Sequence, residues 1–225
     1  MSSFDEPTLG FYSAQAKSYV GHRPEELDPQ IAQFLDLLKA GARILELGCG
    51  GGLDAAHMIS RGFDVDPTDG VAEMAAIAEQ RLTRDVRVMR FDELATVETY
   101  DAVIANASLL HVPTEGLPEI FARIWTALRP GGWHFATFKT GAASGYDRHG
   151  RYYNYLSRAE AKAALSRCWR LGIYRFRRMV RRRLFQRTGH VAQGDRSQST
   201  GLSRDILNYC GLLGLLRRRR PQCSS

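Results

Sequence analysis

The sequence has few of the features that mark secreted, metal-binding or membrane proteins. Its four cysteines, Cys49, Cys168, Cys210 and Cys223, lie far apart and form no C-x-x-C pair, so neither a zinc ribbon nor a thioredoxin-like site is indicated. Scattered single thiols are typical of the reducing cytosol. No apolar run reaches the roughly 18 residues that a membrane-spanning helix needs. The N-terminus lacks the basic-then-apolar pattern of a secretory signal. We therefore expect a cytoplasmic protein with no membrane span and no metal site.

Acidic residues and lysine are nearly absent from the last part of the chain. Residues 166–225 carry 15 arginines, no lysine and only two acids, Asp195 and Asp205. This segment therefore has a net charge of +13 within a chain whose total is +7, and the remainder carries −6. A step of this size indicates two regions of different character.

Three interpretations are open for residues 166–225. Clustered arginine neutralises phosphates, so the segment could be a nucleic-acid-binding arm. The ending LLGLLRRRR could instead belong to a helix on a membrane surface. The third interpretation, which we favour, is a disordered or non-native stretch from a shifted reading frame in a GC-rich gene, because regular periodicity stops abruptly there.

The preceding part of the chain alternates between short apolar runs and amphipathic segments. Strands are expected at 42–48, 63–68, 85–91, 100–107 and 133–139, and helices at 54–60, 71–82 and 117–128. This alternation is typical of an α/β fold: a Rossmann-like, doubly wound, mostly parallel sheet with helices on both faces. Residues 11–38 read as two helices, separated by the Pro-containing stretch HRPEELDP, and residues 1–40 are expected to form an N-terminal helical lid.

The stretch ELGCGGG, residues 46–52, predicts a tight turn between a strand and a helix. A dinucleotide-binding loop has the pattern G-x-G-x-x-G, but Leu53 stands where its third glycine belongs. Glu46 would be a poor neighbour for a pyrophosphate and would suit a ligand with a cationic amino group. These observations argue against an NAD-dependent oxidoreductase, which stays an alternative.

Five motifs in register resemble those of the class I S-adenosylmethionine-dependent methyltransferases. They are ELGCGGG, GFDVDPTDG, FDEL, YDAVIANASLLHV and ALRPGGW, and the resemblance covers roughly residues 10–160. It implies a cofactor-binding domain at 41–165, S-adenosylmethionine as cofactor, and methyl transfer to a small-molecule acceptor. The tellurite-resistance type is one similar group among several. Because 166–225 does not read as the helix and two strands that the family would add, we expect those C-terminal strands to be missing or replaced.

The resemblance also implies which residues hold the cofactor, at the carboxyl edge of the sheet. Asp69, preferred over Asp66, would accept hydrogen bonds from the ribose hydroxyls. Phe91 and Asp92 would flank the adenine. The complete set that it implies is Tyr19, Arg23, Glu46, Gly48, Cys49, Gly50, Asp69, Gly70, Phe91, Asp92, Asn106 and Ala107.

His111 is the candidate catalytic residue, because it follows Asn106 and Ala107, which are expected beside the sulfonium. It could act as a general base or only position the substrate. Tyr12 and Arg23 are expected to help close the pocket from the N-terminal helix. Lys139 and the tyrosines of the GRYYNY segment, residues 150–155, would either line the acceptor site or pack in the core.

Other functions stay open at this point. The Arg-rich segment allows a nucleic-acid-binding protein or an RNA methyltransferase, and a degenerate, inactive methyltransferase is a further alternative. The sequence has no N-P-P-Y-like tetrad for amino-group methylation and no cysteine pair for C5 chemistry. It selects neither the acceptor atom nor an oligomeric state.

Overall fold

The protein is described here from a computed structural model. The structure describes residues 3–22, 25–139, 143–157, 159–161 and 163, and the backbone of 173–178 and 211–217. Within this part of the chain, no helix is both long enough and apolar enough to cross a bilayer.

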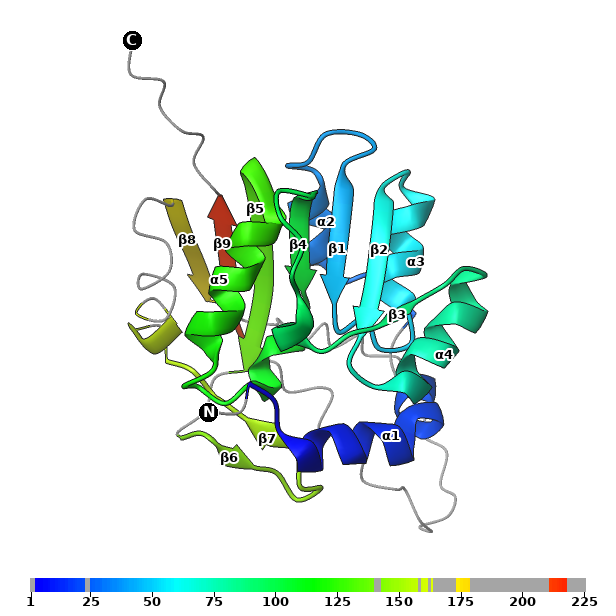
Figure 1. Ribbon diagram of the computed structural model, residues 1–225, viewed down its shortest axis with the longest axis vertical. Helices are drawn as coiled ribbons and strands as arrows, with labels where there is room; N and C mark the ends of the chain where they lie inside the picture. Colours follow the sequence, from blue (N-terminus) through cyan, green and yellow to red (C-terminus); the bar gives the residue numbers. More distant parts are fainter. Residues whose placement is uncertain are drawn as a thin grey trace, which may run out of the picture.

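A seven-stranded sheet forms the centre of the fold, in the order β3-β2-β1-β4-β5-β9-β8 (Figure 1). The strands are β1 (Arg43–Leu47), β2 (Asp64–Asp69), β3 (Arg87–Val88), β4 (Tyr100–Ala105), β5 (Leu128–Lys139), β8 (Ile173–Arg178) and β9 (Gly211–Arg217). The helices are α1 (Glu6–Gly21), α2 (Pro29–Leu35), α3 (Leu53–Ser60), α4 (Ala72–Leu82) and α5 (Leu117–Ala127), with short 3-10 turns η1 (Phe91–Glu93) and η2 (Leu109–His111). The first five strands are all parallel, as the alternating pattern predicted.

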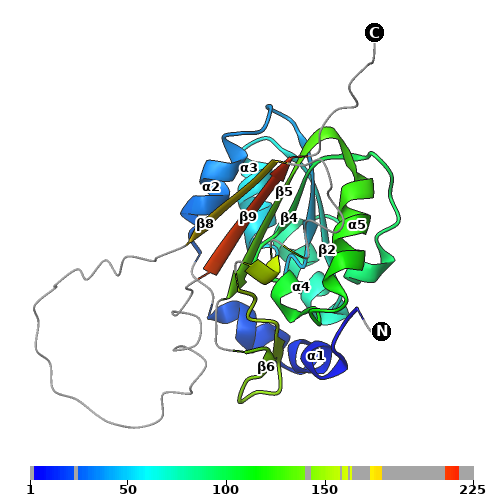
Figure 2. The same ribbon diagram turned by 90° about the vertical axis from the view of Figure 1, so that its left-hand side faces the viewer.

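Helices cover both faces of the sheet because successive strand residues point to opposite sides. In β1, Ile44 packs in the cluster that contains α2 and α3, whereas its neighbour Leu45 packs in the cluster that contains α5. Figure 2 shows α2 and α3 on one side of the sheet and α5 on the other. The predicted doubly wound architecture is therefore confirmed.

The expectation that the C-terminal strands are missing is wrong for two segments. Strand β9 pairs antiparallel with β5 along Trp133–Lys139, and β8 pairs antiparallel with β9. Strand β9 has the sequence GLLGLLR, a short apolar run of the kind that forms buried strands. Without this pairing, β5 would present an unpaired edge. The remaining residues of 166–225 lie outside the described part.

Several element boundaries differ from the sequence expectation, and two of these differences have local causes. Helix α1 begins at Glu6 rather than near residue 11, because the Asp5 side chain caps the Thr8 N–H at 2.9 Å. Strand β3 has two residues rather than seven, because the Val86 N–H donates to Glu79 of α4 and Phe91 already begins η1.

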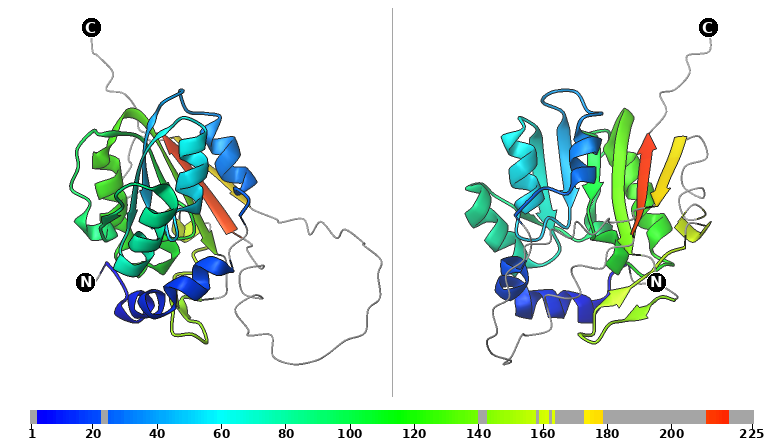
Figure 3. Two further views of the ribbon diagram at one scale, coloured as in Figure 1. Left: turned by 90° about the vertical axis from the view of Figure 1, so that its right-hand side faces the viewer. Right: turned by 180° about the vertical axis from the view of Figure 1, so that it is seen from behind.

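A cap lies across the carboxyl ends of the parallel strands. It consists of α1 and a two-stranded hairpin, β6 (Gly145–Tyr146) and β7 (Tyr152–Tyr153). Figure 3 shows both parts of the cap along this end of the sheet in the view from behind. The Tyr146 hydroxyl donates to Asp5 at 2.8 Å, and the Tyr152 N–H donates to the Thr8 hydroxyl at 2.8 Å. The cap therefore encloses the edge at which ligands of open α/β sheets bind.

Candidate active site

A pocket lies between α1 and the carboxyl edge of the sheet. Its lining is Phe4, Thr8, Leu9, Tyr12, Tyr19, Gly48, Gly50, Asp69, Gly70, Val71, Met74, Arg90, Phe91, Ala107, Ser108 and His111. Apolar and aromatic side chains dominate this set, and a few polar groups converge on the same space. Such a lining is typical of a site for a small organic ligand.

The glycine turn and the end of β2 form one side of the pocket. The N–H groups of Gly48 and Cys49 both donate to the Thr68 carbonyl at 2.9 Å. Gly48 has a φ of +75°, and a Cβ there would lie 2.5 Å from the Cβ of Ser108. Only glycine therefore fits where the turn passes β4. The turn leaves the backbone of Gly48 and Gly50 open to the ligand space.

Asp69 is anchored by that turn. Its carboxylate accepts the Gly50 N–H at 2.8 Å and the Val71 N–H at 2.9 Å, and the residue is 8% exposed. Burial raises the pKa of Asp69 from its ordinary 3.8 to about 6, and the two backbone N–H groups oppose part of this shift. Asp66, the alternative acid, instead bonds to Arg87 at 2.9 Å and to the Tyr100 hydroxyl, outside the pocket lining.

The structure brings most of the predicted site residues together. Those that line the pocket are Tyr19, Gly48, Gly50, Asp69, Gly70, Phe91, Ala107 and His111. Arg23 lies outside the described residues.

Four predicted ligand contacts do not line the pocket. Glu46 is 1% exposed on β1, and Cys49 packs with the apolar residues of α4. Asp92 accepts from Arg90 at 3.2 Å. The Asn106 side-chain amide donates to Asp54 at 3.0 Å, and its oxygen accepts from the Thr137 hydroxyl at 2.8 Å. For these four, contact with the cofactor stays a prediction.

His111 joins the floor of the pocket to both parts of the cap. Its Nδ1 lies 2.6 Å from the Tyr152 carbonyl oxygen, and its Nε2 lies 2.9 Å from the Tyr12 hydroxyl. A carbonyl only accepts, so Nδ1 carries the proton and Nε2 accepts from Tyr12. Burial, together with the charges of Arg151 and Lys139, lowers the pKa of His111 to about 3, and the hydrogen bond to the Tyr152 carbonyl opposes part of this shift.

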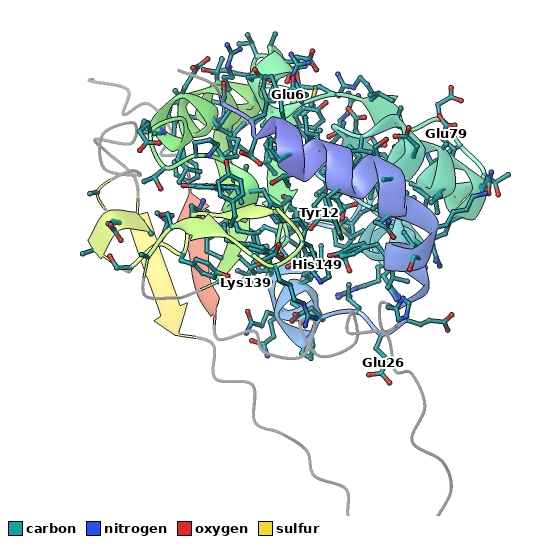
Figure 4. All side chains as sticks on the ribbon, turned by 90° about the horizontal axis from the view of Figure 1, so that it is seen from below. Glu6, Tyr12, Glu26, Glu79, Lys139 and His149 are labelled. Atoms are coloured by element: carbon teal, nitrogen blue, oxygen red, sulfur yellow. The ribbon has the colours of Figure 1, made fainter. Side chains whose placement is uncertain are left out.

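A buried cation holds the two parts of the cap together. Arg151 is 4% exposed and forms two bonds to Asp147, at 2.6 and 2.8 Å. Its guanidinium lies 4.7 Å from the ring centre of Phe11 on α1. Figure 4 shows α1 beside the hairpin at this end of the molecule, with Tyr12, Lys139 and His149 labelled. The Lys139 ammonium lies 4.1 Å from the ring centre of Tyr153, and neither residue belongs to the described pocket lining.

Sequence reasoning missed several lining residues. They are Phe4, Thr8, Leu9, Val71, Met74, Arg90 and Ser108. The first three precede the expected helix start, although the sequence DEPT at Asp5–Thr8 is a recognisable helix N-terminus with a capping Asp and an early Pro. Reading that signal would have extended the lid helix over the pocket.

Comparison with known proteins agrees with this geometry. The ubiquinone biosynthesis O-methyltransferase of Burkholderia lata is 36% identical over 104 residues, which cover 43% of this chain and 44% of that protein. The enzyme of the same name from Chromobacterium violaceum is 31% identical over 150 residues, which cover 60% and 63%. This chain thus matches only about half of the length of these curated relatives.

A solved structure supports the same fold. The 1,6-didemethyltoxoflavin-N1-methyltransferase of Burkholderia thailandensis, with bound 1,6-didemethyltoxoflavin and S-adenosylhomocysteine, superimposes with a TM-score of 0.65 at 19% identity. The superposition covers 95% of this chain and 88% of that one. A family model described as a methyltransferase domain matches residues 19–185, which extends beyond the expected domain end at 165. The chain therefore belongs to this methyltransferase family, and the predicted resemblance to class I methyltransferases is confirmed.

Proposed function

We propose that this chain transfers a methyl group from S-adenosylmethionine to a small-molecule acceptor. The observation that carries the proposal is the pocket in which the glycine turn and the Asp69 carboxylate meet beneath the lid helix α1. S-adenosylmethionine, when bound, supplies a methyl group activated by a sulfonium. The scattered thiols favour a reducing compartment such as the cytoplasm.

The lining residues fit this cofactor better than they fit a dinucleotide. Asp69 offers carboxylate oxygens to the ribose hydroxyls, and Phe91 with Met74 offers apolar surface to the adenine. Among the described lining residues, Arg90 is the only Arg or Lys, and it already pairs with Asp92 and Glu93. A pyrophosphate would therefore meet one neutralised cation and a buried acid, which favours an adenosyl ligand without phosphates over NAD.

The pocket divides into two ends under this proposal. We call the part around Gly50, Asp69 and Gly70 the cofactor end, and the part around Tyr12 and His111 the acceptor end. Ala107, at the end of β4, lies between them, where the family resemblance puts the sulfonium.

His111 fits the role of a positioning residue at the acceptor end. A group with a pKa of about 3 stays neutral at physiological pH and holds an added proton weakly, so it is a poor general base. Methyl transfer to a lone pair mainly requires that donor and acceptor atoms be held in line. Tyr12 and His111 would provide that alignment through their hydrogen-bonding atoms.

The names of two of the similar proteins support an acceptor of low molecular mass. The curated relatives are named for ubiquinone biosynthesis, and the superimposed enzyme binds 1,6-didemethyltoxoflavin. Those names concern an O-methyltransferase and an N-methyltransferase respectively, so the acceptor atom of this chain is left open.

Calorimetric titration with S-adenosylhomocysteine tests the cofactor assignment. We expect Asp69→Ala to weaken binding by at least about tenfold, because a charge-assisted hydrogen bond contributes roughly 1.5–3 kcal/mol and 1.4 kcal/mol corresponds to tenfold. Asp66→Ala is the matched control on the same strand, and we expect its affinity to stay within about twofold of wild type.

Three outcomes would count against the assignment. Failure of the wild-type protein to bind S-adenosylhomocysteine would remove the proposed function. Equal binding by the Asp69→Ala variant would remove the ribose role of that acid. A heat signal with NADH and none with S-adenosylhomocysteine would favour the oxidoreductase alternative.

A further inference from the structure

A chain of three hydrogen bonds runs beneath the pocket floor. The Ala107 N–H donates to the Thr137 hydroxyl at 2.7 Å. That hydroxyl donates its own proton to the Asn106 side-chain oxygen at 2.8 Å, and the Asn106 amide donates to Asp54 at 3.0 Å. Every donor in this sequence has a defined acceptor, so the Thr137 hydroxyl has one orientation.

This series of hydrogen bonds ends at Ala107, whose backbone has a conformation that alanine rarely adopts. Ala107 has a φ of +53°, in the left-handed region, which carries a free-energy cost for any residue with a Cβ. Such a conformation persists only where the surroundings impose it. Here the Thr137 hydroxyl holds the Ala107 N–H directly, and Thr137 is itself 4% exposed on β5.

The same series of hydrogen bonds connects two segments that line the pocket. Asp54 is 2% exposed in the first turn of α3, immediately after the glycine turn, whereas Ala107 follows β4. Thr137 belongs to β5, which contributes no residue to the described pocket lining. The hydrogen bonds therefore fix the end of β4 relative to both the glycine turn and the neighbouring strand.

We propose that Thr137, oriented by Asn106 and Asp54, is a positioning residue of this enzyme that holds Ala107 in its left-handed conformation. This inference rests on the proposed function, because Ala107 lies where the sulfonium is expected. It also gives Asn106 a different role from the direct ligand contact that the sequence suggested. Asn106 supports the pocket floor from below.

The test compares two substitutions at one position by titration with S-adenosylhomocysteine. Thr137→Val keeps the shape but leaves the Ala107 N–H and the Asn106 oxygen without their partner, and we expect about tenfold weaker binding. Thr137→Ser restores the hydroxyl and should bind within about twofold of wild type. Thr126→Val, on the exposed side of α5, removes a hydroxyl bonded only locally to Ala122 and should bind as wild type does.

A double-mutant cycle separates positioning from general loss of structure. Glycine adopts a φ of +53° readily, so Ala107→Gly removes the need for the Thr137 bond. In the Ala107→Gly background, Thr137→Val should weaken binding by less than about threefold. Asn106→Ala, which breaks the middle of the chain and leaves β5 unaltered, should weaken binding by about threefold and serves if Thr137→Val does not fold.

The outcomes separate this inference from the proposed function. Wild-type protein that fails to bind S-adenosylhomocysteine would overturn both. Wild-type binding with an unchanged affinity in Thr137→Val, or in Asn106→Ala, would overturn only the positioning role. The positioning role would also be overturned if Thr137→Val lowered the affinity by the same factor in the wild-type protein and in the Ala107→Gly background.

Discussion

The cofactor end of the pocket contains Asp69 and the acceptor end contains His111, and burial shifts the pKa of each, but the two groups differ in how they are held. Asp69 accepts two backbone N–H groups, which favour its charged form, while burial raises its pKa to about 6. His111 has a pKa lowered to about 3, and its bonds to Tyr12 and the Tyr152 carbonyl fit the neutral ring. Asp69 therefore changes charge near physiological pH, whereas His111 does not.

This difference shows how hydrogen bonding modifies the effect of burial on the pKa of a side chain. Desolvation disfavours the charged form of both groups. At Asp69 the two backbone N–H donors oppose part of that effect. Hydrogen bonds from the ribose hydroxyls would stabilise the charged carboxylate further. At His111 the carbonyl of Tyr152 and the hydroxyl of Tyr12 fix one tautomer and one ring orientation. The cofactor end is thus suited to electrostatic recognition and the acceptor end to fixed geometry.

The largest expected effect concerns His111, which should stay neutral across the pH range in which an ordinary histidine titrates. In histidine ring NMR spectra, we expect the signals of His111 and of His134, whose pKa burial lowers to about 4, to stay unchanged between pH 5.5 and 8. His111→Gln and His134→Gln supply the assignments.

The sign of this effect can be checked through stability. Because the unfolded chain protonates His111 near 6.5 and the folded protein does so only near 3, the contribution of this group to stability is lost as the pH falls below about 6.5. A His111 midpoint above pH 5 in the folded protein would contradict the neutral, positioning role and restore the general-base interpretation.

The next largest effect concerns Asp69 and ligand affinity. The charged carboxylate is the acceptor for ribose hydroxyls, so binding of S-adenosylhomocysteine should weaken as the pH falls through about 6. At pH 5 we expect about tenfold weaker binding than at pH 8, measured by calorimetry.

Two controls sharpen this result. Asp69→Asn cannot titrate and should show weak binding that does not change with pH. The stability of the ligand-free protein should depend on pH in the opposite direction, because a raised pKa in the folded state favours the protonated carboxyl. The stabilising contribution of Asp69 is complete below pH 3.8 and is lost as the pH rises to about 6. Wild-type affinity that is constant from pH 5 to 8 would separate Asp69 from the bound ligand.

How far the sequence predicted the molecule depends on the range of the interactions involved. The sheet and its helices follow from local patterns, such as the adjacent Ile44 and Leu45 that face opposite sides of β1. Asp69 was assigned by resemblance to the methyltransferase family, whereas the glycine turn, like the sheet, was identified from nearby residues. In each case the pattern itself contains the physical cause, which is burial of one face or a tight strand-to-helix turn.

The features that were not predicted depend on residues far apart in the chain. The Asn106 side-chain oxygen accepts a hydrogen bond from Thr137, 31 residues later in the chain. Tyr12 bonds to a ring 99 residues away. Strand β9 was missed because its role depends on pairing with β5 rather than on its own periodicity. The fold and strand ends were therefore predictable, but the long-range hydrogen-bond partners of the site side chains were not.

The smallest expected effect comes from Tyr12, whose hydroxyl connects the lid helix to the acceptor end. Tyr12→Phe removes the donor to His111 Nε2 and should lower the free energy of unfolding by about 1 kcal/mol, measured by urea denaturation. Tyr146→Phe is the matched control: its hydroxyl also connects the cap, to Asp5, but this side chain is 61% exposed and its loss should leave stability unchanged. Because Tyr12 acts at the acceptor end, Tyr12→Phe should bind S-adenosylhomocysteine within about twofold of wild type. A loss of cofactor affinity as large as that of Asp69→Ala would show instead that the two ends of the pocket are not independent.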